Sequence, residues 1–252
     1  MPPSNDPFRV LVFSKTAAYR HACIPAGHAA FADLAAKSNG LFSVVSTEDA
    51  ETYFTPESLS GFATVIFFQN SREVLTTVQM DALKGFIAQG GGYVGVHCAS
   101  GAMYSDPWYG KLVGAFFDFH PEPQRGLLKV ENEDHYLSAP WVPASGQGLD
   151  AIPWFDEWYN YKTNPRLSSA VSDEDGLAPL TVLLSVDHES FEGSTMGAGH
   201  PIAWCRNFGS ARSFYTALGH FDEAYQEERF TEQLRRAILW TAKREEDGAI
   251  CT

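Results

Sequence analysis

The stretch "GGGYVGVHCAS" (90–100) poses the question of fold and function for this chain. Three glycines lead into a short apolar strand, which ends abruptly in His97, Cys98 and small residues. Strand ends of this kind often carry a nucleophile on a tight turn. Three interpretations stay open at this point: His97 is the working residue, Cys98 is the nucleophile, or the segment is only a packed strand end.

Three apolar, β-branched segments before this stretch predict buried strands: "FRVLVFS" (8–14), "LFSVVST" (41–47) and "FATVIFF" (62–68). Helical spacing and end signals predict helices between them: "IPAGHAAFADLAAKSNG" (24–40) and "TTVQMDALKGFIAQGGG" (76–92). Strands that alternate with helices indicate βαβ units around a parallel sheet buried on both faces. In such a sheet, functional side chains gather at the carboxyl ends of the strands.

The remainder of the chain is less regular at first and then regular again. Residues 101–180 are rich in Pro, Gly and Trp and show no clear period, so loops with short strands are expected there. Later strands are predicted at 180–186, 200–206 and 211–218, followed by an amphipathic helix over 227–244. We therefore predict one three-layer α/β/α domain over 7–243, with a mainly parallel central sheet, and a flexible tail over 244–252.

Composition limits the classes of partner. The 252 residues carry a formal net charge of −13, which argues against nucleic acid or an anionic membrane surface. We expect a cytoplasmic protein with reduced thiols, because the amino terminus lacks a signal-peptide pattern and no long apolar run occurs. The four cysteines form no CxxC pair, so a cysteine zinc site is not expected. A homo-oligomer stays open.

The register of the strand end bears on its chemistry. In class I glutamine amidotransferases the nucleophile turn reads G-x-C-x-G, and the matching stretch here is Gly95 to Ala99, with His97 in the nucleophile's place. This favours a functional His97 and a buried, structural Cys98. A Cys98-dependent amide hydrolase or amidotransferase-like enzyme remains the alternative. His120 in "FDFHPEP" (117–123) comes too soon after His97 to support a Cys-His-Glu triad.

The segment "DEWYNY" (156–161) places two carboxylates among aromatic residues. Flat aromatic faces beside carboxylates suit sugar rings, and Glu157 suits a general base or acid if it is partly buried. The other interpretation, an aromatic core edge with a solvated acid pair, is kept beside it.

Histidines recur at predicted strand ends and turns. His21, His135, His200 and His220 each stand at such a place, and together with His97 they can converge on one site. There is no HExxH motif, so no definite cofactor is predicted. A divalent metal such as zinc stays an option, with ligands drawn from His21, His97, Glu157, His200 and His220.

In combination and in order, these segments resemble the ThuA-like family of trehalose-utilisation proteins. The resemblance rests on "YRHACIP" (19–25), "GGGYVGVHCAS", "WYGKLVGAFFDFHP" (108–121), "DEWYNY" and "HPIAWCRNFGSARSFYTALGH" (200–220), and it spans nearly the whole chain. It implies a flavodoxin-like fold of the class I glutamine-amidotransferase type without the thiol at the turn. It also implies a role in carbohydrate metabolism.

The resulting expectation is an enzyme that acts on a sugar, keto-sugar or glycoside by acid–base chemistry, as an isomerase, lyase or hydrolase of a keto-disaccharide. A non-catalytic sugar-binding protein on the same fold is the further alternative. The predicted catalytic residues are Glu157, His97, His200 and His220, and the predicted substrate-binding residues are His21, Arg20, Asn70, Ser100, Trp158 and Tyr159. We expect His97 to point into a solvent-accessible cleft near at least one of these histidines or Glu157, and Cys98 to turn into packing.

Overall fold

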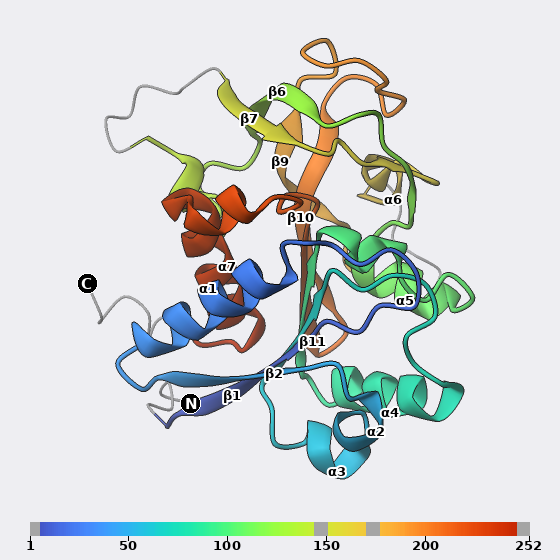
Figure 1. Ribbon diagram of the computed structural model, residues 1–252, viewed down its shortest axis with the longest axis vertical. Coiled ribbons are helices and arrows are strands. Elements are labelled where there is room, and N and C mark those ends of the chain that lie inside the picture. Colours follow the sequence, from blue (N-terminus) through green and yellow to red (C-terminus); the bar gives the residue numbers. More distant parts are fainter. Residues whose placement is uncertain (1–5, 144–150, 170–176, 246–252) are drawn as a thin grey trace.

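The computed structural model describes residues 6–143, 151–169 and 177–245, and these form a nine-stranded sheet between two helical layers (Figure 1). Five neighbouring strands are parallel: β2 (Phe42–Thr47), β1 (Phe8–Phe13), β3 (Thr64–Phe68), β4 (Gly92–Val96) and β11 (Ala211–Thr216). The predicted α/β class, its layers and the parallel sheet of the first hundred residues are confirmed. Strands β3 and β4 are buried throughout, as expected for strands covered on both faces.

Four antiparallel strands continue the sheet beyond β11: β10 (His200–Phe208), β9 (Thr181–Val186), β6 (Gln124–Val130) and β7 (Ile152–Asp156). A separate two-stranded sheet pairs β5 (Phe117–Phe119) with β8 (Asn160–Tyr161). The irregular region 101–180 therefore contributes two strands to the main sheet. Their partners lie far away in sequence, so no local period marks them.

The helices divide between the two faces of the sheet (Figure 1). On one face lie α1 (Ile24–Ala36) and α7 (Glu228–Thr241), and on the other lie α4 (Thr77–Ala88) and α5 (Pro107–Val113). The Thr241 hydroxyl of α7 is 3.1 Å from that of Thr64 in β3, whereas the Tyr109 hydroxyl of α5 is 2.8 Å from that of Tyr93 in β4. The short helices are α2 (Ala50–Tyr53), α3 (Pro56–Leu59), α6 (Pro165–Ser169), η1 (His97–Gly101), η2 (Ala139–Trp141) and η3 (Asp222–Gln226).

Helix ends follow local signals, including one in the region expected to be loops. Thr76 and Gln79 form a capping box at the start of α4. Asp106 accepts a hydrogen bond from the Trp108 backbone at the start of α5, and Gly114 ends that helix with a φ of 96°. The sequence pattern did not predict α5, because a helix of seven residues is too short to show a clear period.

The antiparallel half curves back toward the parallel half. Strand β7 is last in the sheet order, yet Asp156 at its end accepts hydrogen bonds from the backbone of Gly219 (2.9 Å) and His220 (3.2 Å), just after β11. Register shifts between β9 and β10 and the ordinary twist of β-sheets allow this curvature. As a result, the end of β7 meets the carboxyl ends of the parallel strands.

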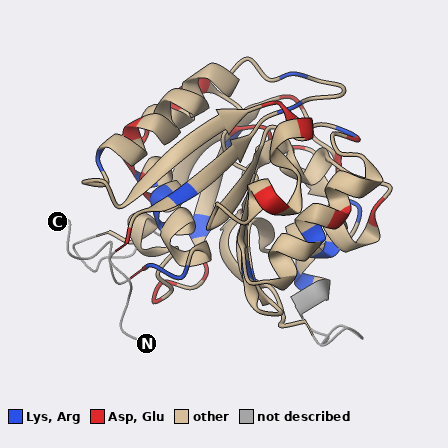
Figure 2. Cartoon of the chain, turned by 90° about the horizontal axis from the view of Figure 1, so that it is seen from below, with Lys and Arg blue, Asp and Glu red and all other residues tan. Residues whose placement is uncertain are grey.

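Charged residues lie mainly on the helices and connecting loops (Figure 2). No helix among the described residues is long and apolar enough to cross a membrane. At the carboxyl terminus, Arg244 donates to the Asp6 carbonyl oxygen, and Glu245 pairs with Arg212 at 2.7 Å. The predicted tail from 244 is thus anchored at its first two residues, and the rest of it, 246–252, lies outside the described residues.

Candidate functional site

Four side chains from distant parts of the sequence meet at the carboxyl edge of the parallel sheet. They are His21, His97, Glu157 and His220, and each offers one potential ligand atom within 4.8 Å of the others. His21, His97 and His220 follow β1, β4 and β11, and Glu157 follows β7 directly. We refer to these four residues as the His/Glu cluster. Parallel strands bring their carboxyl ends to one edge, which explains why the three histidines meet.

His97 occupies a sharp turn that fixes its side chain. Its φ of 51° is in the left-handed region, where a residue other than glycine needs support from its surroundings. That support includes Tyr215, whose hydroxyl donates to the His97 carbonyl oxygen at 2.8 Å and is also 2.8 Å from the Ser100 hydroxyl. The His97 Nδ1 lies 2.6 Å from the Ala217 carbonyl oxygen, so Nδ1 carries the hydrogen and Nε2 is left facing the cluster.

Glu157 is the centre of the polar contacts. Its Oε2 lies 3.3 Å from His97 Nε2 and 3.0 Å from His220 Nδ1, and its Oε1 lies 3.4 Å from His120 Nε2. Burial by itself raises the pKa of the Glu157 carboxyl, but hydrogen bonds with His220 and His97 outweigh it and hold that pKa well below the usual range. Glu157 is therefore an ionised carboxylate at neutral pH, although it is only 8% exposed.

His21 completes a triangle of imidazole rings. Its ring centroid lies 4.9 Å from that of His97 and 5.1 Å from that of His220, and the His97 and His220 rings are 5.3 Å apart. Burial, with the neighbouring His97 and His220 rings, lowers the pKa of His21 to about 2. His21 is therefore a neutral imidazole at physiological pH.

Asp156 does not face the cluster but organises its backbone. One carboxylate oxygen accepts from the Trp154 indole (3.0 Å) and the Gly219 amide, and the other accepts from the Glu157 (2.9 Å) and His220 amides. Since Asp156 is 1% exposed, this fully bonded carboxylate ties the loop after β11 to the end of β7.

The structure places the other predicted site residues outside the cluster. His200 is buried with a pKa lowered by burial to about 4, and its Nε2 lies 2.7 Å from the Tyr159 carbonyl oxygen, so it supports the backbone there. Tyr159 itself contacts the cluster, with its hydroxyl 2.8 Å from His97 Nε2. Trp158 is fully buried and donates to the Gln124 carbonyl oxygen.

The three remaining predicted residues have local partners. Ser100 supports the His97 turn, as described above. Asn70 is buried and donates to the Lys15 carbonyl oxygen at 3.0 Å. Arg20 is half-exposed and pairs with Glu48 at 2.7 Å.

Two features of the site differ from the sequence expectation. His97 does not open to solvent but is fully buried, because His21, His220 and Tyr159 pack around its ring. The more accessible imidazole is that of His120, whose side chain is 33% exposed. His120 was not among the predicted site residues, because the pairing of β5 with β8, which no local pattern reveals, brings it to Tyr159 and Glu157.

Cys98 is buried, and its thiol lies beside the Tyr159 hydroxyl, which in turn contacts His97. Burial raises the pKa of the Cys98 thiol to about 12, so almost no thiolate exists at pH 8. We expect iodoacetamide to alkylate Cys98 in the native chain at least about 100-fold more slowly than in the urea-unfolded chain. Peptide mass spectrometry over a time course measures this, with the Cys98→Ser variant as the control for assignment. Fast, selective labelling of native Cys98 would instead support the thiol-dependent alternative.

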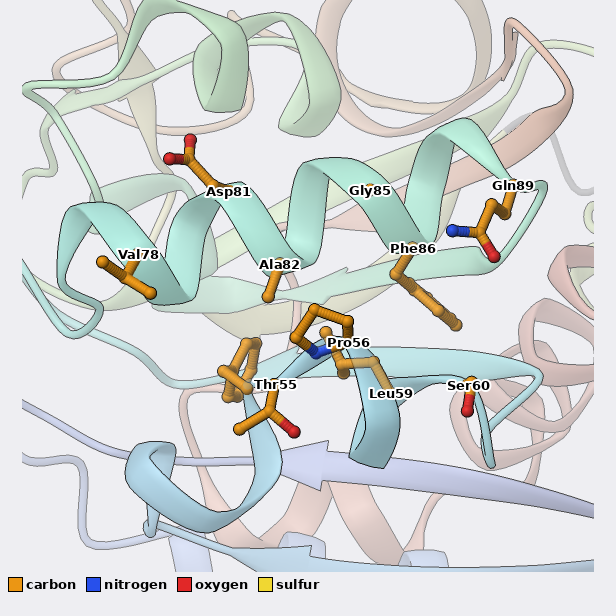
Figure 3. A pocket seen from close by; sticks show the side chains of 11 residues that line it. Thr55, Pro56, Leu59, Ser60, Val78, Asp81, Ala82, Gly85, Phe86 and Gln89 are labelled. Carbon is orange, nitrogen blue, oxygen red and sulfur yellow. The ribbon is translucent and has the colours of Figure 1, made fainter.

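Two surface pockets differ in their relation to the cluster. One, of about 510 Å³, is lined by Trp154, Phe155, Phe221, Arg125, Pro153, Glu223, Ala224 and Glu227. The Phe221 ring stands 4.4 Å from the His220 ring, so this pocket adjoins the cluster. The other, of about 420 Å³, lies between α3 and α4 and has a mostly apolar lining that contains no predicted site residue (Figure 3). The first pocket is therefore the one to consider with the cluster.

Solved structures with the same architecture include a putative ThuA-like protein from Bacteroides uniformis, with 24% identity over 93% of this chain and 91% of that chain and a TM-score of 0.68. A second, from Parabacteroides merdae, has 17% identity over 94% and 90% of the two chains and a TM-score of 0.69. Comparison with curated proteins gives no match. The profile of the ThuA family, described as trehalose utilisation, matches residues 9–241. Because that match covers nearly the whole domain that carries the cluster, the chain belongs to the ThuA family.

Proposed function

We propose that this chain is an enzyme that acts on a sugar, or on a keto-sugar derivative of a disaccharide, by proton transfer at the His/Glu cluster. The observation that carries the proposal is the buried, ionised Glu157, with imidazoles facing both of its oxygens. Family membership supports the substrate class, because the family is described by trehalose utilisation.

The proton would be carried by His120, which the Glu157 carboxylate orients. His120 Nδ1 lies 2.8 Å from the Pro121 carbonyl oxygen, and its Nε2 faces Glu157 Oε1 at 3.4 Å. Both ring nitrogens thus face acceptors, and a doubly protonated ring can donate to both. Since His120 is the partly exposed member, it connects the buried carboxylate with solvent or substrate and suits a general acid or base.

The adjoining pocket supports a carbohydrate substrate. Phe155 is 47% exposed and its ring lies 5.2 Å from that of Phe221, so an aromatic surface is open to a ligand there. Arg125, Glu223 and Glu227 line the same pocket and can bond hydroxyl groups. Aromatic faces with polar groups at their rim suit a sugar ring, and we assign this pocket to the sugar unit that does not react.

The His120→Gln variant tests the proposal. We expect the wild-type chain to turn over a 3-keto-disaccharide and the variant to have a kcat lower by about 100-fold. Chromatography of the products measures the turnover. His188→Gln serves as the matched control. His188 is also a partly exposed histidine, but its Nδ1 faces Asp187 Oδ1, at 3.8 Å, and not the cluster. The contrary outcome is a wild-type chain that binds sugar but turns over no member of a panel of glycosides and their 3-keto derivatives. The chain would then be a sugar-binding protein and not an enzyme.

A further inference from the structure

We propose that the His/Glu cluster binds one divalent transition-metal ion through the imidazoles of His21, His97 and His220 and the Oε2 oxygen of Glu157. This metal site does not depend on the proposed function. It concerns a zinc-like ion, because three imidazoles and one carboxylate are ligands that zinc and similar divalent metals accept.

The separations between the facing atoms match the edges of a coordination polyhedron. Glu157 Oε2 lies 3.0 Å from His220 Nδ1 and 3.3 Å from His97 Nε2, and the two nitrogens are 3.3 Å apart. For metal–ligand bonds of about 2.0–2.1 Å, ligand atoms are about 3.3 Å apart in a tetrahedron and about 2.9 Å apart in an octahedron. A single ion equidistant from these three atoms therefore fits, and the His21 imidazole, whose ligand atom lies within 4.8 Å of the others, would move closer to complete the shell.

One close contact in the cluster brings two acceptors together. With its hydrogen directed at Ala217, a neutral His97 ring turns the Nε2 lone pair toward Glu157, which is itself an acceptor. Tyr159 donates to that nitrogen, and one hydrogen on His220 Nδ1 can satisfy only one of its two neighbours. The approach of His97 Nε2 to Glu157 Oε2 at 3.3 Å is thus left without a hydrogen, and a cation between the two atoms would accept a lone pair from each.

His21 gives an independent indication. It is 3% exposed, and its Nδ1 is buried without a hydrogen-bond partner among the described residues. An unpartnered buried polar atom costs about 1–3 kcal/mol, so a protein keeps one where it has a use. The side chain also lies edge-to-face with both His97 and His220 rather than stacked on them.

The surroundings hold the ligands as metal sites require. The Ala217 carbonyl fixes the tautomer of His97, and Asp156 fixes the backbone of Glu157 and His220. Glu157 Oε1 is not needed by the ion and remains paired with His120. Further coordination positions would take a water or a substrate oxygen, and once His97 Nε2 binds the ion, the Tyr159 hydroxyl is released from that nitrogen to donate to such an oxygen.

The test measures metal binding directly. The full chain is stripped with a chelator, dialysed and titrated with Zn²⁺ by calorimetry and with Co²⁺ by visible absorption. We expect about one ion per chain and a loss of affinity of at least about 100-fold in His21→Gln and in His220→Gln. His28→Gln is the matched control, because His28 is a partly buried histidine that hydrogen-bonds Ser14 outside the cluster. Equal binding by wild type and both cluster variants, or no binding by wild type, would overturn the site.

Two further measurements keep the outcomes separable. If a cluster variant does not fold, X-ray absorption of the Zn²⁺-loaded wild type decides, because the proposal requires about three imidazole nitrogens near 2.0 Å and a shell of oxygen alone excludes it. His120→Gln should bind the ion like wild type, since His120 is not a ligand. Ion binding without turnover of any sugar would reject the proposed function and leave the metal site standing.

Discussion

Replacing Glu157 by Gln should reduce turnover of a 3-keto-disaccharide by about 1,000-fold, within the roughly 10²- to 10⁴-fold range of acid–base catalysis. The amide keeps the size of the side chain but removes the negative charge that faces His97, His120 and His220. It also brings an N–H₂ donor into the cluster and removes the carboxylate that faces and orients the imidazoles. Steady-state kinetics of purified wild type and variant measure the effect.

The Glu232→Gln variant is the control for this substitution. Glu232 is also partly buried and ionised, but it pairs with Arg235 and Arg236 on α7. We expect its turnover to stay within about twofold of wild type, because it contacts no member of the cluster. Unchanged activity of Glu157→Gln, with folding confirmed by circular dichroism, would exclude Glu157 from the reaction.

The second large effect is on stability. Asp156→Ala should lower the free energy of unfolding by about 3–5 kcal/mol, because it leaves four donors, two of them fully buried, without an acceptor. The loss also frees the end of β7 from the loop after β11, so Glu157 and His220 should no longer be held together. Urea unfolding followed by fluorescence measures the stability.

A matched control for that effect is Asp49→Ala. Asp49 also accepts two backbone N–H groups, at the start of α2, but it does so at an exposed position where water can replace it. We expect a clearly smaller loss there than at Asp156. Equal losses in the two variants would mean that the buried bonds of Asp156 do not hold the edge of the sheet to the site.

The sequence by itself determined the parallel half of the fold and much of the His/Glu cluster. Apolar, β-branched runs predict β1, β3 and β4, because strands covered on both faces need apolar residues at every position. The turn at His97 was also predictable, since glycines and small residues surround it. Because the carboxyl ends of parallel strands share one edge, the sequence also predicts that His97 lies near at least one of His21, Glu157, His200 and His220.

Only the tertiary structure decided how the second half of the chain completes the site. Glu157 and His120 reach the cluster because β7 curves back to β11 and because β5 pairs with β8. These pairings join residues far apart in sequence, and strand propensity depends too strongly on such partners to be read locally. For the same reason the sequence did not separate His200, which supports the backbone of Tyr159, from the histidines that face Glu157.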